Sequence, residues 1–162
     1  MLLTRELVCE LHPCYSESKI EELVPEEGIE VRADSNCLEL LLNLPTQDAR
    51  WLVSNLLSLQ KNIEWANRAV ERAKSYAHDS CQNGTGYLIH SAFEAARAAG
   101  VAWLIKMLID QRRLPLEMDI RANGWAREVI TQACYAAGDQ HEKEHRAAMT
   151  DALKLLTEDF SC

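Results

Sequence analysis

The amino-acid sequence predicts an all-α protein: a helical bundle with one long central helix and a small acidic N-terminal subdomain of short helices. Its 162 residues suffice for one domain with a proper core and are too few for two large ones. The composition changes near Pro45, because nineteen of the twenty alanines lie at or beyond residue 49 whereas Glu and Pro concentrate before it. We therefore expect an acidic arm or subdomain over 1–45 and an alanine-rich bundle over 46–162.

The acidic arm is predicted to consist of short elements separated by prolines. Helices are expected over 4–12, from a capping box at Ser18-Lys19-Ile20-Glu21 to Pro25, and over 37–44 behind the cap residue Asp34. Residues 29–33 alternate between apolar and charged, which predicts a brief extended piece.

The strongest periodicity in the chain follows Pro45. Apolar residues recur at alternating spacings of four and three, at Leu52, Leu56, Leu59, Ile63, Ala66, Val70, Ala73 and Ala77. This pattern predicts one long helix from Thr46 to about Asp79, or two nearly collinear helices broken near Lys61-Asn62. Leucine gives way to alanine along this seam, so its C-terminal half is expected to pack closely on a neighbouring helix. Alternatively, the Leu52 to Ala77 seam is the interface of a homo-oligomer.

Turn signals divide the rest of the bundle. Residues 82–86 are the clearest predicted loop, and Asn123-Gly124 marks a further turn. Gly100 is either a helix end or a close-packing point inside a longer helix, and Gly138 suits the position after a helix end. Helices are predicted over 88–113, 125–137 and 139–158.

Charge is the main sequence signal about partners. The net charge is −8, and the first fifty residues hold eleven carboxylates against four cations. Because an anionic chain without a compact basic patch is repelled by phosphates, we expect no nucleic-acid partner. A protein with a basic surface is the expected partner, and Trp51 is predicted to be an exposed anchor because it lies off the seam. The predicted partner-binding residues are Glu17, Glu21, Glu22, Glu26, Glu27, Glu30, Asp34 and Trp51.

The sequence also predicts a cytoplasmic protein with no membrane partner. It begins without a basic segment followed by an apolar run, so no signal peptide is expected. No stretch approaches the ~20 apolar residues that span a bilayer. The six cysteines form no CxxC pair, and in a reducing compartment they are expected to act as small apolar residues.

Two strings are candidate metal sites. His141-Glu142-Lys143-Glu144-His145 has the H-E-x-x-H spacing in which two histidines on one helix face bind zinc and the glutamate acts as general base. Its charged variable positions and its place in the first turn of a helix favour a solvated helix start instead. Cys9, His12 and Cys14, with Cys37 as a distant fourth ligand, match no common zinc module. We therefore predict no metal and no cofactor, with His141, Glu142 and His145 as the alternative.

From Pro45 onward the sequence resembles an uncharacterised family of helical bacterial proteins encoded beside protein-secretion gene clusters. The matching strings are Asp48-Ala49-Arg50-Trp51-Leu52, Glu64-Trp65-Ala66, the run from Ala92 to Gly100, and Ala102-Trp103-Leu104. The sequence departs from that family after the tryptophan helix, where it has only Leu114-Pro115-Leu116. The resemblance implies an accessory protein and assigns no catalytic residues.

These observations favour a non-enzymatic protein-protein interaction protein. An adaptor, chaperone or accessory factor would use the acidic surface for steering and a few apolar anchors for docking. One alternative is an immunity or anti-defence inhibitor that mimics nucleic acid. Another is a small zinc hydrolase at His141 and His145.

Overall fold

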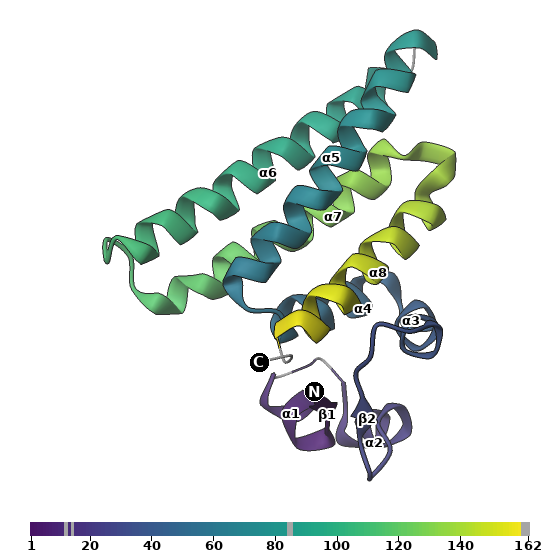
Figure 1. Cartoon of the computed structure of the whole chain (residues 1–162), viewed down its shortest axis with the longest axis vertical. Coiled ribbons are helices and arrows are strands. Elements are labelled where there is room, and N and C mark those ends of the chain that lie inside the picture. The colour runs from purple at the N-terminus through teal and green to yellow at the C-terminus, as the bar shows by residue number, and fades with distance from the viewer. Residues whose placement is uncertain (12, 14, 84–85, 160–162) are drawn as a thin grey trace.

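A computed structural model shows a helical protein, and it describes residues 1–11, 13, 15–83 and 86–159 (Figure 1). The all-α prediction is confirmed, since the described residues form eight α-helices and only two very short strands. The helices are α1 (Arg5–Glu10), α2 (Glu17–Leu23), α3 (Ser35–Leu42), α4 (Thr46–Leu56), α5 (Leu59–Asn83), α6 (Gly86–Asp110), α7 (Asp119–Ala136) and α8 (His141–Asp159). None of these helices is long and apolar enough to cross a membrane.

The first thirty residues form a small module with a core of its own. Strands β1 (Leu2–Leu3) and β2 (Ile29–Glu30) pair antiparallel and bring the two ends of the module together. Its core consists of Leu3, Val8, Ile20 and Val24. Hereafter, "the acidic module" means residues 1–31.

The start of α2 differs from the predicted capping box. Ser16, not Ser18, is the N-cap residue, and its hydroxyl accepts a hydrogen bond from the backbone N–H of Lys19. Ser18 has the glutamate of a capping box three residues later and Ser16 has a lysine there, so the sequence favoured Ser18 and the backbone conformation decided for Ser16. Ser16 is extended, with φ −70° and ψ 156°, which is the usual N-cap geometry.

Helix α3 belongs to the bundle by packing, although it lies within the predicted acidic arm. Asp34 caps it as predicted, because its carboxylate accepts from the backbone N–H of Cys37 at 3.0 Å. Cys37 and Leu41 of α3 then join the main core, and α3 contacts α8. A truncation that preserves the bundle core must therefore end before Asp34 and not at Pro45.

The long seam is divided between two helices. The break falls at Leu57, which is extended at ψ 140°, and not near Lys61-Asn62 as predicted. Asn62 holds this corner together from inside α5, because its side-chain amide reaches the backbone carbonyls of Ser54 and Leu57 at 2.8 and 3.1 Å. Asn62, where the sequence predicts a break, therefore lies inside α5. It donates hydrogen bonds to carbonyls at the observed break, which falls at Leu57, five residues earlier.

Helices α5, α6 and α7 contact one another and form the centre of the bundle, with α8 packed on α5 and α7 (Figure 1). Alanines fill the contacts, as the alanine-rich half of the seam predicts: Ala66, Ala69 and Ala73 of α5 are fully buried. The seam residues Ile63, Ala66, Val70 and Ala73 are buried within the chain itself. These four residues therefore offer little surface to a second copy of the chain, and the homo-oligomer through the Leu52 to Ala77 seam stays a prediction.

Two turn predictions have opposite outcomes. Asn123-Gly124 lies inside α7, because Ala122 and Ala126 on either side are fully buried and the side chain of Asn123 accepts a hydrogen bond from Asn62 at 3.0 Å. Tertiary contacts override the local turn preference here. Gly138 follows the end of α7 at φ +53°, in the left-handed region predicted for it. Gly100 lies inside α6, and Gly84 and Thr85 of the predicted 82–86 loop are outside the described residues.

Candidate protein-binding site

The predicted acidic residues fall into two groups in the structure. Glu22 pairs with Lys19 at 2.8 Å, and Arg32 lies between Glu30 and Asp34 at 3.5 and 3.2 Å. These three carboxylates are therefore partly neutralised within the chain, and Asp34 is also a helix cap. The remaining four are exposed and form no ion pair with any described residue: Glu17, Glu21, Glu26 and Glu27.

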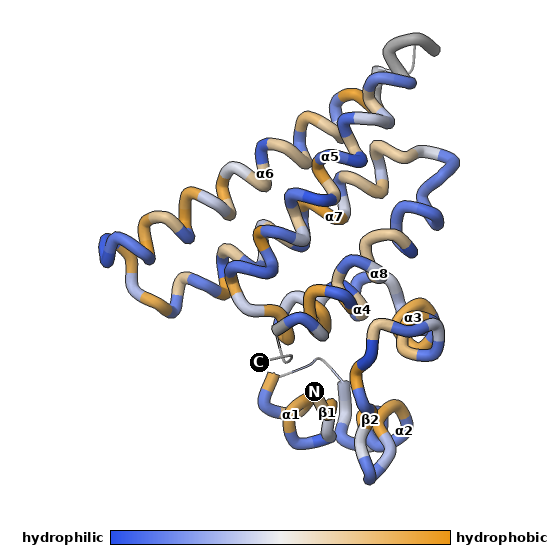
Figure 2. The backbone as a smooth tube through the Cα atoms, in the orientation of Figure 1, coloured by the Kyte–Doolittle hydropathy of each residue, from blue (hydrophilic) through white to orange (hydrophobic). Residues whose placement is uncertain are grey.

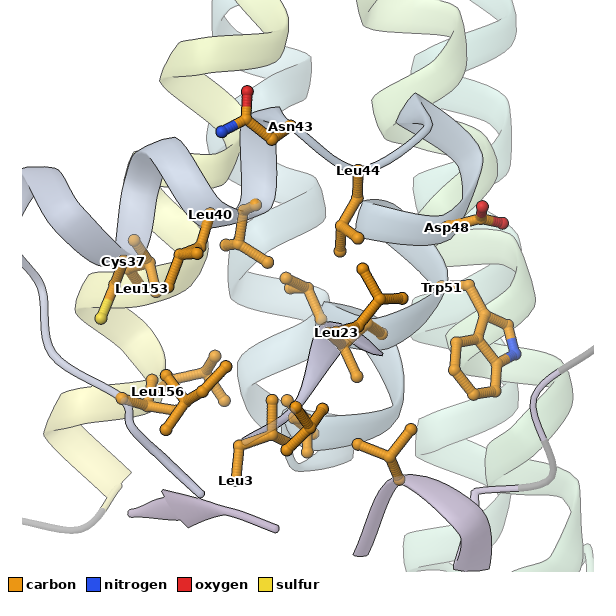
Figure 3. Close-up of a pocket in the computed structure, with 18 of the residues that line it drawn as sticks. Leu3, Leu23, Cys37, Leu40, Asn43, Leu44, Asp48, Trp51, Leu153 and Leu156 are labelled. Carbon is orange, nitrogen blue, oxygen red and sulfur yellow. The ribbon is translucent and has the colours of Figure 1, made fainter. Parts of the chain in front are cut away.

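An apolar pocket lies between the acidic module and the bundle and is lined by residues of both (Figure 3). Its volume is about 190 Å³, somewhat more than the ~150 Å³ of a cavity that holds benzene. In Figure 3 the side chains of Leu3, Leu23, Leu44 and Leu156 gather around the hollow, whereas the polar ends of Asn43 and Asp48 lie at its edge. The pocket, hereafter the junction pocket, has room for one or two apolar side chains of a ligand.

Helix α2 forms one wall of the junction pocket and also carries exposed acidic residues. Ile20, Leu23 and Val24 line the pocket, while Glu17 and Glu21 are exposed. Ile20 and Val24 are four residues apart and line the pocket together, whereas Glu17 and Glu21, also four apart, are exposed on the neighbouring face. Opposite α2, Leu40 of α3 lines the pocket and is itself 50% exposed, so the apolar lining continues to the surface.

Trp51 lies at the junction, as a half-buried residue and not as the freely exposed anchor that the sequence predicts. It lines the junction pocket and also a polar groove between α4 and α7. Tyr15 and Asp48 belong to both hollows as well, and the Tyr15 hydroxyl donates a hydrogen bond to the Asp48 carboxylate. That bond raises the pKa of Tyr15 to about 12. These three residues form a partition between an apolar and a polar hollow.

The polar groove contains two arginines that the sequence analysis did not single out. Arg50 is only 5% exposed and donates to the hydroxyl of Thr131 at 2.9 Å and to the sulfur of Cys134 at 3.2 Å. Arg127 is half-buried, and burial lowers its pKa. Neither arginine forms an ion pair with a carboxylate in the part of the chain that the structure describes.

The histidine motif begins α8, and its members differ in their exposure. Glu142, the expected general base, is exposed, whereas His145 is 8% exposed and neither of its ring nitrogens has a hydrogen-bond partner. Burial, with the nearby positive charge of Arg50, lowers the pKa of His145 to about 4, so it is neutral at physiological pH. The described residues contain no group of three His, Cys, Asp or Glu side chains that could hold a metal ion.

Within that motif the structural residue is Glu144, which the prediction of a solvated helix start missed. Its carboxylate is fully buried, and both oxygens accept from Arg72 Nε at 2.9 Å. Arg72 also reaches Asp151 at 2.5 Å, and the hydroxyl of Tyr76 donates to Glu144 at 3.2 Å. Burial raises the pKa of Glu144, while the hydrogen bonds from Arg72 and Tyr76 oppose that shift. These hydrogen bonds link Arg72 and Tyr76 of α5 to Glu144 and Asp151 of α8.

The predicted cysteine cluster is not assembled by the described residues. Cys9 is exposed near the end of α1, and Cys37 is buried in α3. The thiol of Cys37 donates to the backbone carbonyl of Glu30 at 3.4 Å, which ties α3 to the acidic module. His12 and Cys14 lie outside the described residues.

One further surface was missed by the sequence analysis. The interior face of α6 is made of alanines, whereas its large apolar residues Phe93, Trp103 and Leu104 are 64%, 55% and 46% exposed. Figure 2 shows apolar residues recurring along the whole of α6. The spacing of Phe93, Ala96, Gly100, Trp103 and Met107 was the available signal, because it repeats three and four like a helix face.

Comparison with protein-family models, curated proteins and solved structures found no match to this chain. The resemblance to helical proteins encoded beside secretion clusters therefore stays a prediction from the sequence. A helical bundle by itself does not select a function, so the hollows and charges of this chain are the features that bear on its function.

Proposed function

We propose that the chain is a non-enzymatic protein-binding protein, an adaptor, chaperone or accessory factor, that takes up a basic, amphipathic segment of a protein partner at the junction pocket. The observation that supports this most is the combination of an apolar hollow with unpaired carboxylates on, and shortly after, the helix that walls it. An apolar anchor alone would leave the acidic residues unexplained, and charge alone would leave the hollow unexplained.

The chemistry of the partner follows from that combination. Leucine-sized side chains on one face of the partner segment would enter the hollow lined by Leu23, Leu40 and Leu44. Lysine or arginine beside them would meet Glu21, Glu26 and Glu27, which have no cation of their own within the described chain. The charges would raise the association rate and set the orientation, and the apolar contacts would provide most of the affinity.

A synthetic helical peptide of leucine and lysine tests this function by calorimetry with the full chain. We expect binding that weakens as salt is raised, because the charges involved are exposed, and no binding of a matched leucine-glutamate peptide. A lysine peptide without leucine should bind much more weakly. If it binds equally well, the surface is purely electrostatic, and the nucleic-acid mimic replaces this proposal.

Matched variants locate the site. The triple variant Glu21→Gln, Glu26→Gln and Glu27→Gln should reduce affinity for the leucine-lysine peptide by about tenfold, at roughly half a kilocalorie per mole for each exposed charge pair. The control neutralises three exposed carboxylates of the bundle, Glu117, Asp139 and Glu142, and should leave the affinity unchanged. Leu40→Ser should weaken binding without unfolding the chain, because Leu40 is half exposed. Equal affinity of all these variants would contradict the proposal.

A further inference from the structure

The polar groove between α4 and α7 is lined by two arginines that form no ion pair with a described residue. It has a volume of about 390 Å³ and includes Arg50, Arg127 and Thr131 in its lining. A buried guanidinium normally has a carboxylate partner, since an isolated charge in a low-dielectric interior is costly. Here Arg50 is 95% buried by area, yet its contacts are a hydroxyl and a thiol.

The groups to which Arg50 donates hydrogen bonds are neutral. Burial raises the pKa of the Cys134 thiol to about 11, so no thiolate is present at physiological pH. His145, whose charge interacts with that of Arg50, is neutral for the reason given above. One donor of Arg50, its Nε, is buried without a hydrogen-bond partner. The guanidinium of Arg50 therefore has no ion-pair partner among the described residues and one unused donor.

Arg127 adds a second cation on the neighbouring helix. Its side chain forms no hydrogen bond or ion pair with a described residue, and burial alone accounts for the lowering of its pKa. Two carboxylates also line the groove, and each accepts a hydrogen bond from a neutral group and not from an arginine. Asp48 accepts from the Tyr15 hydroxyl, and Glu128 accepts from the side-chain amide of Gln132 at 2.8 Å.

We propose that this groove binds a small organic anion, whose carboxylate or phosphate group is held by Arg127 and Arg50 and whose apolar body lies against Trp51. Guanidinium groups suit this task because their planar fork matches two oxygens of a carboxylate or phosphate. The volume of the groove is in the range of small-molecule sites. Trp51 and Tyr15 provide an aromatic wall on the side away from α7. The groove shares Tyr15, Asp48 and Trp51 with the junction pocket but needs no protein partner to hold an anion.

The test compares anions with neutral molecules of the same shape on the full chain. Benzoate and phenyl phosphate are titrated against benzamide and phenol, and binding is followed by the NMR signal of the Trp51 indole, assigned through Trp51→Phe. We expect saturable shifts with the anions and none with the neutral molecules. Benzoate against phenyl phosphate tells which anion is preferred, and inorganic phosphate tells whether the ring contributes.

Arg127 carries the mutational test because it is partly exposed and holds no other residue, whereas Arg50 supports the contact between α4 and α7. Arg127→Gln should weaken anion binding by about tenfold, the usual effect of losing a charge-assisted hydrogen bond. The matched control is Arg121→Gln, an exposed arginine six residues earlier on the same helix, which should bind like the original protein. Equal binding of benzamide and benzoate, or an unchanged affinity in Arg127→Gln, would overturn the proposal.

Discussion

Several carboxylates of the acidic module are exposed and form no ion pair with a described residue, whereas at the contact between α5 and α8 a carboxylate is buried and paired. In the module, Glu17, Glu21, Glu26 and Glu27 are exposed and unpaired by any described residue. Between α5 and α8, Glu144 is fully buried and accepts hydrogen bonds from both Arg72 and Tyr76. The physical reason is desolvation, because a charge can lose its water only if another group replaces it. Unpaired carboxylates are therefore tolerated only where water, or a partner protein, can reach them.

The largest expected effect is the loss of the buried pair. Arg72→Met leaves the Glu144 carboxylate buried without its cation, and we expect the free energy of unfolding to fall by about 3–5 kcal/mol in urea titrations. The double variant Arg72→Met with Glu144→Leu should recover most of that loss, because no uncompensated charge remains. A loss below about 1 kcal/mol in the single variant would contradict this prediction, because it would mean that the buried pair contributes no more to the free energy of unfolding than a surface pair does.

The second expected effect is a pH dependence from His145. Its pKa falls from the ordinary 6.5 to about 4 in the folded chain, so the unfolded chain takes up a proton first as the pH is lowered. Stability from this group is therefore complete above pH 6.5 and is lost between pH 6.5 and pH 4. The loss is about 3 kcal/mol at 1.36 kcal/mol per pKa unit.

Urea titrations at a series of pH values check this dependence. His145→Leu should flatten the profile between pH 6.5 and pH 4, and the unpartnered ring nitrogens would disappear with it. His141→Gln, four residues earlier, is the matched control and should keep the decline. If both variants decline like the original protein, another group is responsible for the pH dependence.

The smallest expected effect distinguishes two acidic residues within the predicted arm. Asp34→Ala removes the acceptor for the backbone N–H of Cys37 and should lower the Tm by about 3 °C, as the loss of a helix cap does in a chain of this size. Glu27→Ala, which has no partner in the described chain, should leave the Tm unchanged. Equal Tm values for both variants would mean that the cap contributes nothing measurable.

Local signals predicted the helices where the physical cause was local. Asp34 was recognisable as a cap because its short carboxylate can reach a free backbone N–H three residues on. Gly138 was recognisable because a left-handed conformation costs glycine little. The break before α5 was misplaced by a few residues because the seam continues across it. The turn at Asn123-Gly124 was wrong because burial of Ala122 and Ala126 outweighed it.

The candidate sites were much less predictable. The acidic surface could be read from composition, but its division into paired and unpaired carboxylates could not. The junction pocket collects residues from Leu3 to Leu156, and the polar groove joins α4 to α7. Arg50 and Cys134 are 84 positions apart in the chain, and no spacing rule relates them.

The sequence by itself determined that this chain is helical, that its first part is acidic, and that its interior is close-packed through alanine. These properties follow from residue types and from the helical period, which act within a few residues. Only the tertiary structure decided which charges are paired, that α6 turns its large apolar residues outward, and that hollows lie on both sides of Trp51. The physical reason is that contacts between helices depend on their register and rotation, and these are fixed by the packing of the whole bundle.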